Sequence, residues 1–278
     1  MDLGEALQFF TTELADHTED PALEARLLIQ KATGLSRPVL LSRPEFPLDN
    51  ITYTKISALC KQRQQGIPLP YLLGEWEFYG HPFFVDPSVL IPRPETELLV
   101  EQAAAWLKNY PQFRDGFDIG TGSGCIAISL LLAFPELRMT AVELKPEALR
   151  TAIRNAERHR CSDRFRPVCA DLFSAISCEP RLICANLPYI PSETCRTIEP
   201  ARFEPMSALD GGADGFDLYR LLFAQIANKI KGECLILCEI EYRQRELALA
   251  TARAFFPGRT IRVLNDLAGM ARVLEIRG

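Results

Sequence analysis

The sequence predicts an α/β protein in which a small helical bundle precedes a mostly parallel β-sheet covered by helices. Two observations lead to this prediction. From about residue 113 to the C-terminus, apolar strand patterns alternate with helix patterns, which is typical of a parallel sheet with helices on both faces. The first 70 or so residues contain only helix patterns. A chain of 278 residues has room for one domain of roughly 200 residues and a smaller one.

The N-terminal segment carries start and stop signals for helices. Asp20 can cap a helix whose first position is Pro21, and Gly34 can end it. A second capped helix is expected from Asn50 to Gln65. The residues expected to face the core of this bundle are Leu23, Leu27, Ile29, Ile51, Ile56 and Leu59.

A stretch rich in proline, glycine and aromatic residues follows the bundle. Trp76–Tyr79 and Phe83–Val85 are separated by a Gly80-His81 turn, which indicates a two-stranded hairpin. A helix is expected to begin at Pro94 and to end near Lys108. The predicted parts are a helical bundle over residues 1–70, a hairpin and linker over 71–93, and a sheet domain over 94–278.

The sheet domain is predicted to contain seven strands. These are expected at residues 113–119, 139–143, 165–169, 182–185, 234–240, 260–264 and 272–276. The helices between them are expected at 125–134, 146–160 and 217–230. Ligands of such domains bind at the carboxyl ends of the strands, so the residues that follow each strand are the candidates for function.

Composition excludes several classes of protein. The net charge of −5 disfavours a nucleic-acid partner. Nine cysteines are scattered through apolar segments without a C-x-x-C pair, so neither a disulfide scaffold nor a metal site is expected. The start lacks a basic segment before an apolar run, and no stretch is apolar enough to span a membrane. We therefore expect a cytoplasmic protein.

A glycine-rich turn follows the first predicted strand. Its residues are Asp118, Gly120, Thr121, Gly122, Ser123 and Gly124. Alternating glycines let the backbone approach a ligand closely, and the helix that follows offers free N–H groups. The spacing differs from the dinucleotide fingerprint, and an aspartate at the strand end suits a cationic ligand. A purely structural turn is the alternative.

Two further acidic positions follow neighbouring strands. Glu143 lies 25 residues beyond Asp118, where a carboxylate can accept hydrogen bonds from ribose hydroxyls. Asp171 and Leu172 follow the third strand and suit the edge and face of an adenine. Together these features predict a nucleoside-bearing cofactor, and Asp118 favours S-adenosyl-L-methionine, whose product is S-adenosyl-L-homocysteine.

The fourth strand ends in Asn186-Leu187-Pro188-Tyr189, which resembles the N-P-P-Y motif of methyltransferases that act on nitrogen conjugated to a π-system. The resemblance assigns these residues as catalytic: the Asn186 side chain and the Leu187 carbonyl accept the two N–H hydrogens, and Tyr189 packs on the planar group. Asn186 is also expected to contact the cofactor. A strand-ending turn with a packed tyrosine is the alternative. The motif departs at Leu187, where the family usually has proline, but Pro188 still favours extended backbone there.

Nearly the whole chain resembles the peptide chain release factor glutamine methyltransferases. The similar segments are LGEWEFYGHPFFVDPSVLIPRPETELLVE, ANLPYIP, FEPMSALDGGADGFDLYR and LNDLAGMARVLEI. The resemblance implies a seven-stranded Rossmann-like methyltransferase sheet, release factors as partners, and methylation of the glutamine in a Gly-Gly-Gln loop. It further implies substrate docking by the N-terminal domain, and a monomer is expected. Substrate contacts are assigned to Arg93, Glu95, Thr96 and Phe203. Capping and domain packing are the alternative for the first three, and a simple structural turn is the alternative for Phe203.

Two other functions remain open from the residues alone. An adenine-N6 DNA methyltransferase could use the same clamp for an exocyclic amine, but it would need a basic surface and base flipping. A catalytically silent protein that only binds release factors is the other alternative, with Leu187 as a mark of lost activity.

Overall fold

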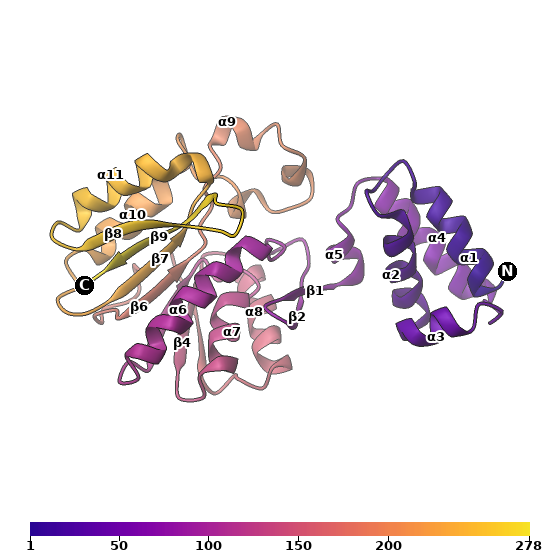
Figure 1. The fold of residues 1–278 in the computed structure, drawn as a ribbon, viewed down its shortest axis with the longest axis horizontal. Helices are drawn as coiled ribbons and strands as arrows, with labels where there is room; N and C mark the ends of the chain where they lie inside the picture. Colours follow the sequence, from indigo (N-terminus) through magenta and orange to yellow (C-terminus); the bar gives the residue numbers. More distant parts are fainter. The chain divides into compact units, whose positions relative to one another are not determined.

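Residues 1–278 are described in the computed structural model, with the exception of the Glu199 side chain. They separate into two units, Met1–Glu75 and Trp76–Gly278. The helices of the first unit are α1 (Leu3–Leu14), α2 (Pro21–Thr33), α3 (Arg37–Ser42), α4 (Asn50–Gln64) and α5 (Leu69–Leu73). Helices α1, α2 and α4 pack against one another (Figure 1).

The expected caps of α2 are present. The Asp20 side chain accepts a hydrogen bond from the Leu23 backbone N–H at 3.0 Å, and Gly34 ends the helix in the left-handed region at φ 71°. The expected core was partly wrong, because Ile51 is 70% exposed and Leu23 is 38% exposed. Ile51 is at the start of α4, and Ile56 follows five residues later and is buried. Because five residues make about 1.4 turns of an α-helix, the two side chains lie on different sides of α4.

The predicted hairpin is formed by β1 (Glu75–Phe78) and β2 (His81–Phe84). Its turn residues are Tyr79 and Gly80, one position earlier than expected, with φ values of 51° and 73°. Two consecutive positive φ angles define the turn type whose twist matches that of antiparallel strands.

The second unit contains the seven-stranded sheet. Its strands are β3 (Asp115–Ile119), β4 (Arg138–Glu143), β5 (Phe165–Cys169), β6 (Leu182–Ala185), β7 (Leu235–Glu239), β8 (Thr260–Asn265) and β9 (Ala271–Arg277). The order is β5-β4-β3-β6-β7-β9-β8, and β9 pairs antiparallel with both of its neighbours. The predicted mostly parallel sheet is confirmed. The strand order reverses direction at β3 and β6, and such a switch point opens a crevice at the strands' carboxyl ends.

Helices cover both faces of this sheet (Figure 1). Apolar residues of α6 (Glu97–Asn109), α7 (Cys125–Ala133) and α8 (Pro146–Arg158) form one core cluster with the sheet. Those of α10 (Asp217–Ile226) and α11 (Arg245–Phe255) form the cluster on the other face. The short helices are η1 (Pro94–Thr96), α9 (Ser192–Cys195), η2 (Glu199–Arg202), η3 (Met206–Ala208) and η4 (Tyr242–Gln244).

Helix α11 was not predicted from the sequence. A capping box precedes it, in which the Glu241 side chain accepts from the Arg243 backbone and the Gln244 side chain from that of Glu241. This pattern is a recognisable start signal for a helix.

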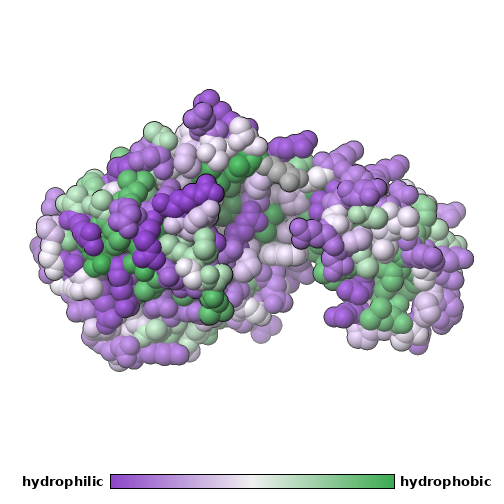
Figure 2. All heavy atoms as spheres, turned by 45° about the horizontal axis from the view of Figure 1, so that its top comes forward, coloured by the Kyte–Doolittle hydropathy of each residue, from purple (hydrophilic) through white to green (hydrophobic). Residues whose placement is uncertain are grey.

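Within the described residues, no helix has both the length and the apolar character needed to cross a membrane. The surface seen in Figure 2 is largely hydrophilic, with small hydrophobic patches between polar side chains.

Candidate active site

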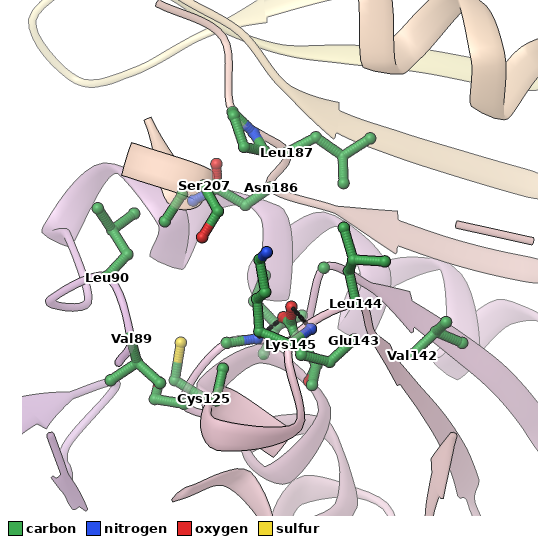
Figure 3. Close-up of a pocket in the computed structure, with 18 of the residues that line it drawn as sticks. Val89, Leu90, Cys125, Val142, Glu143, Leu144, Lys145, Asn186, Leu187 and Ser207 are labelled. Carbon is green, nitrogen blue, oxygen red and sulfur yellow. Dashed lines mark hydrogen bonds between the residues drawn. The ribbon is translucent and has the colours of Figure 1, made fainter. Parts of the chain in front are cut away.

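A cavity of about 960 Å³ opens at the carboxyl ends of β3, β4, β5 and β6. The residues predicted from the sequence that line it are Arg93, Thr96, Gly120, Thr121, Gly122, Ser123, Glu143, Asp171, Leu172, Asn186, Leu187 and Pro188. In Figure 3, Asn186, Leu187 and Ser207 lie on one side of this cavity, whereas Cys125, Glu143 and Lys145 lie on the opposite side. The topology therefore brings together segments that are far apart in the sequence.

The glycine-rich turn forms one wall of the cavity. The N–H groups of Gly120 and Thr121 donate to the Val142 carbonyl at 2.9 and 3.0 Å, which ties the turn to β4. Gly120 has φ 72°, and a Cβ built there would lie 2.8 Å from Cδ2 of Leu187. Position 120 therefore requires glycine, both for its backbone conformation and for its close approach to the fourth strand.

Asp118 does not line the cavity, contrary to the expected contact with a cationic ligand. It is fully buried beneath the turn, where Oδ2 accepts hydrogen bonds from the Thr121 hydroxyl at 2.6 Å and the Ala127 N–H at 3.2 Å. Burial raises the pKa of Asp118 to about 6, and these two hydrogen bonds oppose the rise. Asp118 thus holds the turn and the start of α7, while the surface of the turn faces the cavity.

Glu143 ends β4 on the floor of the cavity (Figure 3). Its Oε2 accepts from the Gly122 N–H and its Oε1 from the Lys145 N–H, each at 3.0 Å. A carboxylate has about four acceptor positions, so both oxygens retain a lone pair for further donors such as hydroxyls. The two backbone contacts fix its orientation.

Asp171 and Leu172 continue the same wall after β5. Leu172 is 8% exposed and has φ 50°. A left-handed conformation is uncommon for a non-glycine residue and is often found at functional sites. The turn places one apolar and one acidic side chain beside the floor residue Glu143.

Asn186 lies where the large cavity meets a smaller one of about 450 Å³. Asn186, Arg93, Leu90 and Ala208 line both cavities. The Asn186 Nδ2 donates to the Thr96 Oγ1 at 3.1 Å, which leaves the side-chain oxygen as its other polar atom. The Leu187 N–H donates to the Tyr219 hydroxyl at 3.1 Å.

Tyr189 lines only the smaller cavity. Its hydroxyl donates to Oε1 of Glu239 at 3.2 Å. Burial raises the pKa of Tyr189, and the charge of Glu239 raises it further, so the phenol stays neutral. The ring is thereby held at the wall that Asn186 shares.

The remaining predicted residues are placed differently. Arg93 pairs with Glu204 at 2.5 Å and so ties the segment before η1 to the loop that precedes η3. Burial raises the pKa of Glu204, whereas Arg93 lowers it. The Glu95 carboxylate lies 3.9 Å from the Arg272 guanidinium, and the Glu95 side chain is 43% exposed. The predicted residues that line neither cavity are Asp118, Gly124, Glu95 and Phe203.

Three contributors to the site were not assigned individual roles from the sequence: Tyr219, Glu204 and Glu239. A signal exists for Glu239, because it ends the otherwise apolar strand Leu235–Glu239. A carboxylate in such a strand is expected to be buried with polar partners. Tyr219 and Glu204 lie in the segment FEPMSALDGGADGFDLYR, whose resemblance to the family was the available signal.

The chain matches known proteins over almost its full length. Residues 5–74 match the model of the PrmC N-terminal domain, and residues 94–196 match that of the methyltransferase small domain. The chain is 41% identical over 229 residues to the release factor glutamine methyltransferase of Chlorobaculum tepidum, an alignment that covers 78% of this chain and 76% of the relative. It is 37% identical over 273 residues to the release factor glutamine methyltransferase of Moorella thermoacetica, which covers 97% and 95%.

A crystal structure of a methyltransferase from Pyrococcus furiosus has the same fold. It superposes with a TM-score of 0.50 at 16% identity, over 72% of this chain and 89% of that one. Both relatives are more than 30% identical to this chain over most of their length, and both family models match it. The chain belongs to the release factor glutamine methyltransferase family.

Proposed function

We propose that this chain transfers the methyl group of S-adenosyl-L-methionine to the side-chain amide nitrogen, N5, of the glutamine in the Gly-Gly-Gln motif of peptide chain release factors. The observation that carries the proposal is that two cavities meet at Asn186, one lined by the glycine-rich turn and Glu143 and the other by Tyr189. The larger one suits the cofactor, and the smaller one suits an amide side chain. Family membership supports the choice of acceptor.

The residues around the larger cavity fit the cofactor. Glu143 retains acceptor positions for ribose hydroxyls, and Leu172 supplies an apolar surface for an adenine. Gly122 lines the cavity, and a Cβ there would meet no atom within 4 Å, so the turn leaves open space at that position.

The amide clamp needs two acceptors and a planar surface. When bound, S-adenosyl-L-methionine supplies a sulfonium methyl that is open to attack by a lone pair. An amide nitrogen is a weak nucleophile, so the side-chain oxygen of Asn186 and the carbonyl of Leu187 accept its two hydrogens and orient that lone pair. Tyr189 packs against the amide plane. No strong base is needed before transfer, because the nitrogen becomes acidic as it gains the methyl group.

The first unit is assigned to docking of the release factor, since its residues match the model of the PrmC N-terminal domain. Because release factors act in translation, the chain is assigned to the cytoplasm, where it works as a monomer.

Mass spectrometry of a release factor co-expressed with this chain tests the proposal. The expected result is one added methyl on the Gly-Gly-Gln peptide, which is absent without the chain. An unmodified factor that still co-purifies with the chain would instead identify a silent binder. Transfer of labelled methyl to adenine in DNA, with none to the factor, would identify the DNA methyltransferase.

A further inference from the structure

The backbone of the amide clamp is hydrogen-bonded to a buried tyrosine. Tyr219 of α10 is fully buried, and its hydroxyl accepts a hydrogen bond from the Leu187 backbone N–H at 3.1 Å. The same hydroxyl lies 2.5 Å from the Glu239 carbonyl oxygen and 3.3 Å from that of Ala185. A phenol oxygen accepts as well as donates, so this one atom connects the clamp to the ends of β6 and β7.

Two backbone angles set the direction of the Leu187 carbonyl, which the proposed function assigns to the acceptor amide. Pro188 favours extended values of ψ at Leu187, because its ring collides with other conformations of the preceding residue. The angle φ of Leu187 has no such covalent restraint. A proline ring at position 187 would fix φ at about −65°, and leucine lacks that ring.

Rotation about φ of Leu187 is prevented when the groups on both sides of the N–Cα bond are held. On one side, the Tyr219 hydroxyl holds the N–H. On the other side, the Leu187 side chain is 2% exposed and belongs to the same apolar core cluster as Tyr219 and Phe216. Its Cδ2 also fills the space that Gly120 leaves, since a Cβ there would lie 2.8 Å from it. The hydrogen bond and the packing together impose the restraint that a proline ring would impose.

We propose that Tyr219 is a positioning residue that holds Leu187 so that its carbonyl faces the acceptor amide. The Tyr219 hydroxyl thereby compensates, in this chain, for the proline that is absent at position 187. This inference rests on the proposed function and extends it to a residue of α10 that lines neither cavity. Tyr219 is assigned no contact with the glutamine or with the transferred methyl group.

Two variants of the full chain separate this role from simple packing. Tyr219→Phe removes the hydroxyl and keeps the ring in the core. Tyr219→Phe/Leu187→Pro restores the restraint on φ without a hydrogen bond, and the missing hydroxyl leaves room for the proline ring. Tyr110→Phe is the matched control, because the Tyr110 hydroxyl also has a partner far away in the sequence, Arg277 at 3.3 Å, and Tyr110 lines neither cavity.

The experiment measures kcat and KM for methylation of a purified release factor, together with the Kd of S-adenosyl-L-homocysteine. We expect kcat to fall by about tenfold or more in Tyr219→Phe, because a small displacement of a group that orients the reactants has an effect of this size. The double variant should recover kcat to within about threefold of the wild-type value, since its ring restrains φ. KM and Kd should stay within about threefold in every variant, and Tyr110→Phe should turn over normally.

The outcomes distinguish the two proposals. If the wild-type chain does not methylate the factor, the proposed function fails and the positioning role fails with it. If the wild-type chain is active and Tyr219→Phe keeps its kcat, only the positioning role is overturned. If the double variant turns over as slowly as Tyr219→Phe, the loss comes from the contacts with Glu239 and Ala185, and the role is overturned as well.

A second measurement applies should Tyr219→Phe not fold. Leucic acid in place of Leu187 exchanges the backbone N–H for an ester oxygen and leaves Tyr219 with its other two contacts. A reduced kcat in that chain supports the positioning role, and a normal kcat overturns it.

Discussion

The side-chain amide of Asn186 joins the two cavities of the catalytic unit. Its nitrogen donates a hydrogen bond to the Thr96 hydroxyl. Its oxygen is the atom that we assign to binding of the glutamine amide that receives the methyl group. The consequence at the scale of single residues is that binding of the cofactor and orientation of the acceptor depend on different atoms.

Asn186→Ala should separate these two events. We expect kcat/KM for release factor methylation to fall by at least about 100-fold, because a lost transition-state contact of this type costs roughly 3 kcal/mol. Calorimetry should show a Kd for S-adenosyl-L-homocysteine within about threefold of the wild-type value. Asn109→Ala, at the exposed end of α6, is the control. Normal turnover in Asn186→Ala would exclude the amide clamp.

The titration of Glu239 should appear in the pH dependence of turnover. Burial raises its pKa to about 7, the hydrogen bonds from Thr96 and Tyr189 lower it, the charge of Glu95 raises it, and that of Arg272 lowers it. Its backbone carbonyl accepts from Tyr219 of α10. As pH falls through about 7, Glu239 gains a proton, so the Tyr189 hydroxyl no longer donates to a negatively charged acceptor.

We therefore expect kcat to decrease on the acid side of about pH 7 in the wild-type chain. In Glu239→Gln, the pH profile of kcat should lack this acid limb, because glutamine does not titrate. Initial rates between pH 5.5 and 9 provide the measurement. An acid limb of the same midpoint in Glu239→Gln would assign it to another group.

At the scale of elements, the segment that follows β6 is hydrogen-bonded to the glycine-rich loop around Gly211. Gly211 donates its N–H to the Ile190 carbonyl at 2.8 Å, and the Ile190 N–H donates to the Leu209 carbonyl at 3.0 Å. A Cβ at position 211 would lie 2.6 Å from the Pro188 carbonyl oxygen and 2.8 Å from the Tyr189 Cα. The glycine-rich loop therefore supports the backbone of the clamp.

Gly211→Ala should displace that backbone. We expect kcat to fall by roughly 10- to 100-fold with little change in cofactor affinity, since the overlap is with main-chain atoms of the clamp. Gly116→Ala is matched to it, because its Cβ would also lie 2.6 Å from a neighbour, here the flexible Met139 side chain on β4. Initial-rate assays give kcat for both variants, and cofactor titrations give their affinities for the cofactor. A normal kcat in Gly211→Ala would remove the supporting role of the loop.

Leu187, which replaces the first proline of the N-P-P-Y pattern, has a backbone N–H that proline would lack. The Leu187 N–H donates to Tyr219, and the Leu187 side chain is 2% exposed. Leu187→Pro removes this donor, so we expect the free energy of unfolding to fall by about 1–3 kcal/mol. The carbonyl at position 187 remains, and kcat should not decrease. Urea unfolding provides the measurement.

Tyr219→Phe tests whether the lower free energy of unfolding expected in Leu187→Pro comes from the lost hydrogen bond to Tyr219. The double variant Leu187→Pro/Tyr219→Phe should lose less stability than the sum of the two single variants, because both remove the same hydrogen bond. Strict additivity would show that this bond contributes nothing to folding.

At the scale of the whole molecule, the residues that line both cavities lie between Ser88 and Leu218, inside the unit Trp76–Gly278. The chemistry and the proposed docking of the release factor therefore belong to different parts of the chain.

Removal of residues 1–75 should affect substrates of different size unequally. We expect kcat/KM to fall by more than about tenfold for the intact release factor, since docking energy is lost, and to stay nearly constant for a short Gly-Gly-Gln peptide. Cofactor binding by the shortened chain checks that its cavity is formed. Equal losses for factor and peptide would argue against a docking role for the first unit.

Signals between near neighbours in the chain were sufficient to predict much of this protein. The cap at Asp20, the glycines at 120–124 and the alternation of strands with helices depend on contacts within a few residues or on local periodicity. The same holds for Asn186 at the end of a strand. These patterns were enough to predict the sheet and a ligand site at its carboxyl edge.

Only the tertiary structure decided which side chains support that site. Thr96 and Asn186 are 90 residues apart, and Tyr189 and Glu239 are 50 apart, so no local pattern links them. The Asp118 side chain lies beneath the glycine-rich turn because α7 packs there and its Ala127 N–H donates to the Asp118 carboxylate. The sequence did not show on which side of β3 this helix would pack. Hydrogen bonds of this kind form between groups that packing brings together, and packing depends on the order of all the strands at once.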